Sequence, residues 1–282
     1  IFVKFCRMIT RWTIAGIAAA LAAPIGFEFS QSLQTLPKAA AIPLAPEDLS
    51  RGTQRVPAFQ PGEFLRFDID YGVIPAGTAT LEVKHSKSGL WEIRAEGRSR
   101  RFYDWVFPVR DTYISTFDPQ TQLPVRFVRN ISEGGYRLEQ DYRFNWSAGW
   151  CETEEHRRRT PDVEDAFQMP GRMQDMVSAF CVARNMDFSE LEMGQTFSIP
   201  TLVDGETYDL RIAYGGKALK EAAGREWSCL VFHPVIQEGR IWSSPDDLTL
   251  WISDDSRHLP ICVESDLLVG TIRMTLKDCT LP

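Results

Sequence analysis

The stretch GEFLRFDIDYGVIPAGTATLEV, residues 62–83, decides the fold. Its residues alternate between apolar and polar, as in Leu65, Phe67, Ile69 and Tyr71 against Arg66, Asp68 and Asp70. A period of two gives a strand one buried and one solvated face, which is typical of antiparallel sheets. The segment 73–77 contains Pro and Gly and predicts a turn, so the stretch predicts two antiparallel strands.

The same alternation continues along most of the remaining chain. It covers residues 93–96, 110–117, 123–132, 136–145, 150–158, 195–203, 206–214, 226–235, 247–253, 259–265 and 270–279. About a dozen strands are too many for a flat sheet, which must curl, close or split into layers. The pattern therefore predicts one curved sheet.

One segment has the period of a helix. Over residues 175–187 the apolar positions recur every three or four residues, at Met176, Ala179, Phe180, Ala183 and Met186. Asp175 at the start and Arg184 near the end suit the helix dipole. We therefore expect a mainly β fold, with a strongly curved antiparallel sheet (an open or half β-barrel) packed around one α-helix. A shorter helical turn is expected at 101–106.

The N-terminal region predicts export. Lys4, Arg7 and Arg11 precede an uncharged apolar stretch over residues 12–23, the layout of a secretory signal. We expect residues 1–29 to be a signal peptide or an N-terminal anchor, 30–61 a Pro/Ala-rich tether, and 62–282 a single antiparallel β domain. The expected location is periplasmic or otherwise associated with the cell envelope.

Charge and cysteine content narrow the function classes. The net charge of −7 disfavours nucleic acid as a partner. No Cys/His cluster has zinc spacing and no nucleophile motif is present, so we expect no metal, no cofactor and no catalytic residue set. In an exported chain disulfides are the first interpretation of cysteines. The candidates for at least one bridge are Cys229, Cys262 and Cys279; the alternative is that they are small core residues.

Six blocks of sequence resemble the domain of unknown function 3108 family. They are the opening stretch at 62–83, FPVRDTYIS at 107–115, RNISEGGYR at 129–137, QDMVSAFCVAR at 174–184, LTLWISDDSRHLPICVES at 248–265 and VGTIRMTL at 269–276. The resemblance implies an exported bacterial envelope protein. It also implies an open or half β-barrel, similar in outline to lipoprotein carriers, and no settled reaction.

These features favour a noncatalytic protein that binds or carries an apolar ligand, such as a lipid or an envelope polymer intermediate. We expect its pocket between helix 175–187 and the strands near 64–83 and 248–276. The candidate ligand-binding residues are Met176, Phe180, Arg184, Arg101, Asp111, Asp175 and Trp251. For Asp254, a hairpin turn is the simpler interpretation.

Two alternatives stay open at this point. One is an enzyme that acts on envelope glycan or lipid through scattered acids such as Asp111, Asp175 and Asp254. The other is a structural interaction module whose exposed edge strands recruit an envelope protein partner. The sequence does not indicate an oligomeric state.

Overall fold

The computed structural model of the chain describes residues 57–105, 107–158, 160–235, 248–267 and 270–282. The expected signal or anchor at 1–29 and most of the expected tether lie outside these residues. Across the described ranges, no helix combines the length and the apolar character needed to cross a membrane.

The first part of the chain is an up-and-down run of strands. Its elements are β1 (Phe64–Tyr71), β2 (Ile74–His85), the 3₁₀ turn η1 (Lys87–Gly89), β3 (Trp91–Ser99), η2 (Arg101–Tyr103), β4 (Arg110–Asp118), β5 (Leu123–Glu133), β6 (Tyr136–Asn145), β7 (Trp150–Arg157) and β8 (Thr160–Gln168). Each strand pairs antiparallel with the next. The alternation that opens the sequence is the reason: β1 buries every second side chain at Leu65, Phe67 and Ile69, and β2 buries Leu81 and Val83 between more exposed neighbours.

A helix separates this run from a second one. It is α3 (Met176–Arg184), followed by β9 (Thr196–Val203), β10 (Glu206–Ala222), β11 (Arg225–Val235), β12 (Leu248–Ser253), β13 (Pro260–Asp266) and β14 (Thr271–Thr280). The helix starts where the sequence predicts, because Asp175 caps it: its carboxylate accepts from Val177 N and Ser178 N, and Ser178 Oγ accepts from Asp175 N.

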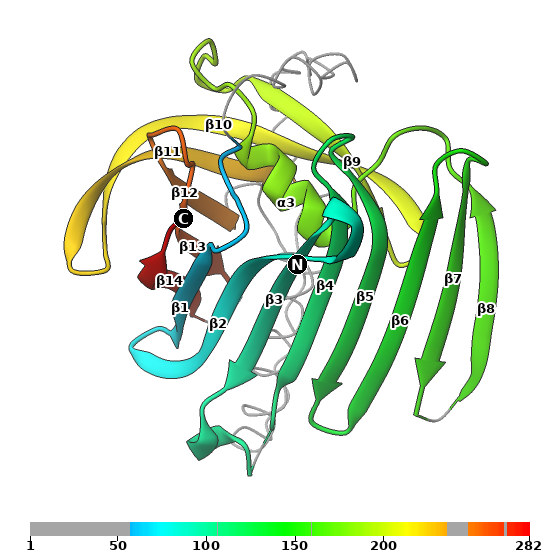
Figure 1. Cartoon of the computed structure of the whole chain (residues 1–282). Helices are drawn as coiled ribbons and strands as arrows, with labels where there is room; N and C mark the ends of the chain where they lie inside the picture. Colours follow the sequence, from blue (N-terminus) through cyan, green and yellow to red (C-terminus); the bar gives the residue numbers. More distant parts are fainter. Residues whose placement is uncertain (1–56, 106, 159, 236–247, 268–269) are drawn as a thin grey trace, which may run out of the picture.

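The two runs form one antiparallel sheet of fourteen strands among the described residues. Strand β14 pairs with β1, so the order is β8-β7-β6-β5-β4-β3-β2-β1-β14-β13-β12-β11-β10-β9. Strands β8 and β9 are the two edges, and the sheet curves around α3 without closing (Figure 1). The expected curved, open sheet around one helix is confirmed.

The long hairpin of β10 and β11 bends back over the sheet. Its register shifts between Tyr214 and Gly216, where Gly216 has a φ of +95°, a value that suits glycine. Beyond the bend the hairpin reaches β13 and β14, and Ala223 N donates to Leu276 O at 3.1 Å. Residues 229–232 of β11 and 260–263 of β13 are therefore buried on both faces of the sheet.

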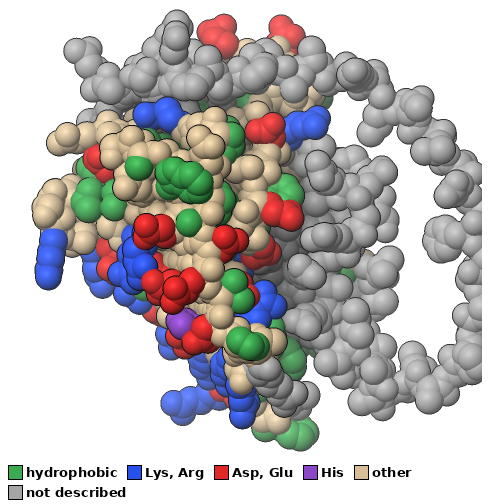
Figure 2. Space-filling view, turned by 90° about the vertical axis from the view of Figure 1, so that its right-hand side faces the viewer, with side chains coloured by type: hydrophobic (Ala, Val, Ile, Leu, Met, Phe, Trp, Pro, Cys, Tyr) green, Lys and Arg blue, Asp and Glu red, His purple; other side chains and the backbone are tan. Residues whose placement is uncertain are grey.

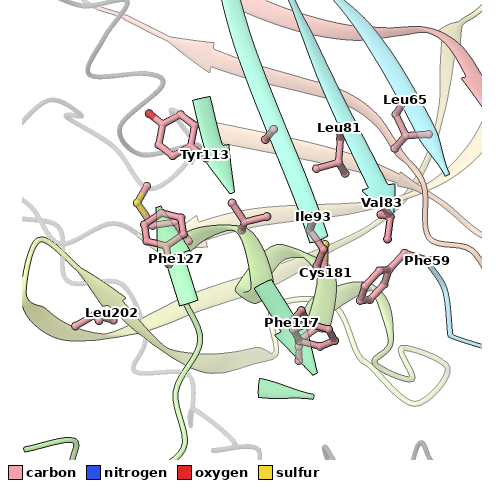
Figure 3. Packing of buried hydrophobic residues seen from close by; sticks show 14 of the residues in the cluster. Phe59, Leu65, Leu81, Val83, Ile93, Tyr113, Phe117, Phe127, Cys181 and Leu202 are labelled. Carbon is pink, nitrogen blue, oxygen red and sulfur yellow. The ribbon is translucent and has the colours of Figure 1, made fainter. Parts of the chain in front are cut away.

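The core lies between α3 and the concave face of the sheet. Cys181 of α3 packs among Ile93, Phe117 and Phe59 (Figure 3). The ring of Phe59 lies 5.6 Å from that of Trp91 and 5.8 Å from that of Phe117, measured between ring centroids. The folded domain therefore includes Phe59, which precedes residue 62. The sequence predicts this segment as part of the tether because its neighbours are polar or proline.

Candidate functional site

A row of polar side chains crosses the inner face of strands β4 to β7. Tyr113 is paired with Arg129, Arg129 with Gln140, and Gln140 with Glu155. Directly paired residues on adjacent strands point to the same face. The row therefore forms a continuous polar line across four strands on the concave face of the sheet.

Arg129 is the centre of the row and is fully buried. Its Nη2 donates to Asp204 Oδ1 at 2.8 Å, and its Nη1 lies 3.9 Å from Met176 Sδ of the helix. Asp204 belongs to the turn between β9 and β10 and has a φ of 56°; Gly205 follows it. This β9–β10 turn therefore covers the inner face of β5.

Asp111 and Glu133 are buried beside the arginine. Ser132 N donates to Asp111 Oδ1 at 3.0 Å. Burial raises the pKa of Asp111 to about 6, against the opposing effects of the hydrogen bonds from Ser132 and Glu133 and of the positive charge of Arg129. Burial also raises the pKa of Tyr113, and the nearby Asp111 adds to that shift.

The row becomes more exposed toward the edge of the sheet. Gln140 is buried and its Nε2 donates to Glu155, whose side chain is partly exposed. Glu155 is paired with Val163 of the edge strand β8, and Val163 is 53% exposed. The side of the molecule at this edge carries interspersed acidic and basic side chains (Figure 2). The row therefore connects the interior to solvent at β8.

Arg129 Nε and Gln140 Oε1 are buried and have no hydrogen-bond partner among the described residues. An unsatisfied buried polar atom costs about 1–3 kcal/mol, so native proteins keep few of them. Two such atoms on directly paired residues mark the region as the candidate functional site.

The structure brings only two of the sequence-predicted ligand residues to this site, Met176 and Asp111. Asp175 instead caps α3 and accepts a hydrogen bond from Ser115 Oγ. Arg184 forms a buried ion pair with Glu63, with N–O distances of 2.7 and 2.9 Å. Phe180 packs, partly buried, against the core cluster.

The remaining two predicted ligand residues lie elsewhere. The ring of Trp251 faces the ammonium group of Lys220 at 3.7 Å. Arg101 lies on the outer face of the sheet, at the 3₁₀ turn η2. Asp254 lies in the expected hairpin turn, where its carboxylate pairs with Lys217 at 2.6 Å.

The expected disulfide is not formed in the structure. Cys229, Cys262 and Cys279 are free thiols on β11, β13 and β14. Burial raises the pKa of the Cys229 thiol to about 11 and also raises that of Cys262. The pairing stays a prediction, and the structure accommodates Cys229 and Cys262 as buried core residues.

Sequence reasoning missed Arg129, Gln140, Glu155 and Asp204. Arg129 and Glu133 both lie in the RNISEGGYR block, but nothing in that block shows which side of the strand faces inward. Only the strand register aligns Arg129 with Gln140 and Glu155.

Comparisons with known proteins agree with this architecture. The sequence profile of a family described as "Protein of unknown function (DUF3108)" matches residues 66–277. A solved structure of a β-barrel-like protein of domain of unknown function DUF1849 from Brucella abortus has a TM-score of 0.53 at 10% identity, covering 79% of this chain and 99% of that one.

Other similarities are weaker. A putative exported protein with a YmcC-like fold from Bacteroides fragilis has a TM-score of 0.27 at 7% identity, covering 79% of this chain and 97% of that one. The MucA/MucB complex of Pseudomonas aeruginosa has a TM-score of 0.17 at 9% identity, covering 84% of this chain and 92% of that one. No curated protein matches the chain.

Proposed function

Because the chain belongs to the DUF3108 family, a family of unknown function, we propose from its geometry that it is a noncatalytic binding protein of the bacterial envelope. Its ligand lies on the inner face of the sheet, between the β9–β10 turn and the open edge at β8. This places the ligand farther along the sheet than the sequence predicts, because the side chains between α3 and strands β1 to β3 pack as core.

The two partnerless atoms, Arg129 Nε and Gln140 Oε1, carry the proposal. Each of them lost its hydration when the domain folded, and neither gained a partner among the described residues. A bound polar group that reaches Arg129 Nε and Gln140 Oε1 recovers that free energy. An apolar side chain of similar size would avoid the cost entirely, so stability alone does not account for these residues.

The surroundings of the row indicate an amphiphile. The rings of Phe127 and Tyr142 lie 6.0 Å apart beside Arg129, and Val163 offers an exposed apolar surface at the edge. Ligand sites combine apolar walls with a few oriented polar groups. The proposed ligand is therefore a lipid or an envelope polymer intermediate, with its polar group at Arg129 and Gln140 and its apolar part toward β8.

An enzyme is the second candidate, and the raised pKa of Asp111 favours it, since general acids often have raised pKa values. The other two acids of that hypothesis, however, are used elsewhere, Asp175 as a helix cap and Asp254 in an ion pair. An enzyme would have to bring the reacting bond of its substrate to Asp111, whereas a binding protein would not.

The envelope location and an envelope protein partner belong to the same proposal. The N-terminal charged and apolar segments support export, and β8 has a further strand on only one side among the described residues, so its other side could pair with a partner strand. Fractionation of cells that make the full chain tests the location. Recovery in the cytosolic fraction alone would contradict it.

Native mass spectrometry of the protein purified from its own envelope tests the ligand. We expect the wild type to carry an added amphiphile mass and Arg129→Met to lose it. The matched control is Arg126→Gln, on the same strand, because Arg126 faces outward and pairs with Asp141. Each variant removes one arginine–aspartate pair, but only one alters the row.

A second variant, Gln140→Met, keeps the test decisive if Arg129→Met does not fold. It keeps the volume of the side chain and removes the partnerless oxygen, so we expect a folded protein with less ligand. Wild-type protein that carries no added mass, or an Arg129→Met protein that retains the ligand as the control does, would contradict the proposed site.

A further inference from the structure

A cavity of about 590 Å³ opens on the outer face of the sheet, opposite the proposed ligand site. Strands β1, β2 and β14 form its floor, and the η2 segment forms its wall. Four cations, one acid and one ring line it: Arg66, Arg100, Arg101, Lys277, Asp68 and Phe102.

The lining has an excess of positive charge. Lys277 Nζ lies 2.6 Å from Asp68, and Arg100 lies 3.8 Å from the same carboxylate. Arg66 pairs with Asp278, whereas Arg101 has no ion pair with any residue in the described ranges. A single lining carboxylate is thus shared by two cations, and the cavity suits an anion.

Exposed apolar side chains surround the same end of the sheet. Phe102 is 74% exposed and Trp105 is 82% exposed, both between β3 and β4. Val73, in the β1–β2 turn, is 96% exposed. Arg100 N donates to Ala76 O at 3.0 Å, which holds the two connections at one end (Figure 1).

We propose that this end of the domain binds the surface of an anionic phospholipid bilayer. The arginines contact lipid phosphates, because a guanidinium group donates two parallel hydrogen bonds to a phosphate. Phe102, Trp105 and Val73 enter the interfacial layer, where aromatic rings are favoured. A soluble anion would use the cations of the cavity and leave the three apolar side chains in water.

The net charge of −7 does not oppose this contact. Charges separated by more than about 8–10 Å are largely screened at physiological salt, so the local cations decide the interaction. The rest of the domain is repelled, which orients the molecule with this end toward the bilayer. The inference uses none of the residues of the proposed ligand site and stands independently of it.

Hydrogen–deuterium exchange of the full chain with vesicles tests the proposal. Vesicles of equal parts phosphatidylglycerol and phosphatidylcholine should slow exchange in residues 72–75 and 100–107, and vesicles of phosphatidylcholine alone should do so much less. Because the exchange is read segment by segment, any membrane contact of residues 1–56 is separated from this one.

Two double variants are compared with wild type for vesicle binding detected at the same segments. Arg100→Gln with Arg101→Gln should weaken binding about 25-fold, since each cation at an anionic surface contributes about fivefold. Phe102→Ser with Trp105→Ser should weaken it at least about tenfold. The controls Arg143→Gln and Leu219→Ser change an exposed arginine and an exposed apolar side chain on other strands, and should bind as wild type does.

Three results would overturn the proposal. The first is unchanged exchange at 72–75 and 100–107 with anionic vesicles. The second is equal binding by wild type and both double variants. The third is the same protection from inorganic phosphate alone, which would assign the cavity to a soluble anion.

Discussion

Arg184 and Arg129 are both fully buried, and their surroundings differ. Arg184 donates to both oxygens of Glu63 and to the carbonyl oxygens of Ala58 and Arg257. Arg129 has one carboxylate partner, Asp204, and its Nε has none in the described structure. Arg184 joins residues 58–63, α3 and the β12–β13 turn. Arg129 lies under the β9–β10 turn, near the open edge at β8.

This difference separates a structural region from a candidate binding region. A buried ion pair with all its hydrogen bonds made holds segments together and offers nothing to a ligand. A buried cation with an unsatisfied donor, beside an unsatisfied amide oxygen, costs stability until something binds. Substitutions at the two places should therefore have opposite consequences.

The largest effect is expected at the satisfied arginine. Glu63→Gln leaves Arg184 buried without a counter-charge and should lower the free energy of unfolding by about 3–5 kcal/mol, measured by urea denaturation. The double variant Glu63→Leu with Arg184→Met removes both charges and should lose less than the single variant. If Glu63→Gln lowers the free energy of unfolding by less than about 1 kcal/mol, the proposed difference between the two regions is contradicted.

An intermediate effect is expected from Asp111. Its pKa is raised from 3.8 to about 6 in the folded state, so between these values the folded protein holds a proton that the unfolded chain releases. The free energy of unfolding should therefore fall as the pH rises from about 4 to 6, by about 1–3 kcal/mol from this group.

Asp111→Asn isolates that contribution from the other carboxyl groups. Arginine partners lower the pKa of Asp104 and Glu154, which gives these two acids the opposite dependence on pH. The difference in unfolding free energy between wild type and Asp111→Asn should change with pH across the same window. A difference that is constant from pH 4 to 7 would contradict the raised pKa.

The smallest effect is expected from Gln140→Met in ligand-free protein. The substitution removes a partnerless buried oxygen and one hydrogen bond to the partly exposed Glu155. The two changes oppose each other, so stability should stay within about 1 kcal/mol of wild type or rise. Gln174→Met is the comparison, because it also removes a partnerless oxygen but loses a hydrogen bond to the backbone of Gln122.

Local patterns in the sequence predict most of the fold. Alternation locates the strands, and the spacing of Met176, Ala179 and Ala183 together with the capping acid Asp175 locates the helix. Strand β8 was missed because TPDVEDAFQ is polar on both faces, as suits an exposed edge. Phe59 was assigned to the tether because a single ring among prolines has no period.

The candidate site depends on information that local patterns lack. Whether Arg129 meets Gln140 depends on the register of two strands and on which face turns inward. The contact of Arg129 with Asp204 depends on where the chain runs 75 residues further along the sequence. The helix residues were predicted as ligand contacts because an amphipathic stripe looks the same whether it faces a cavity or a packed core.

The pairing of β1 with β14 also affects how the domain is made. These are the first and last strands of the described residues, yet they lie side by side in the middle of the sheet. During synthesis the run from β1 to β8 can form early, but the free edge of β1 must wait for residues 271–280. Pairings between such distant segments form slowly. The sheet of the nascent chain therefore remains incomplete, with an exposed edge at β1, until residues 271–280 have emerged.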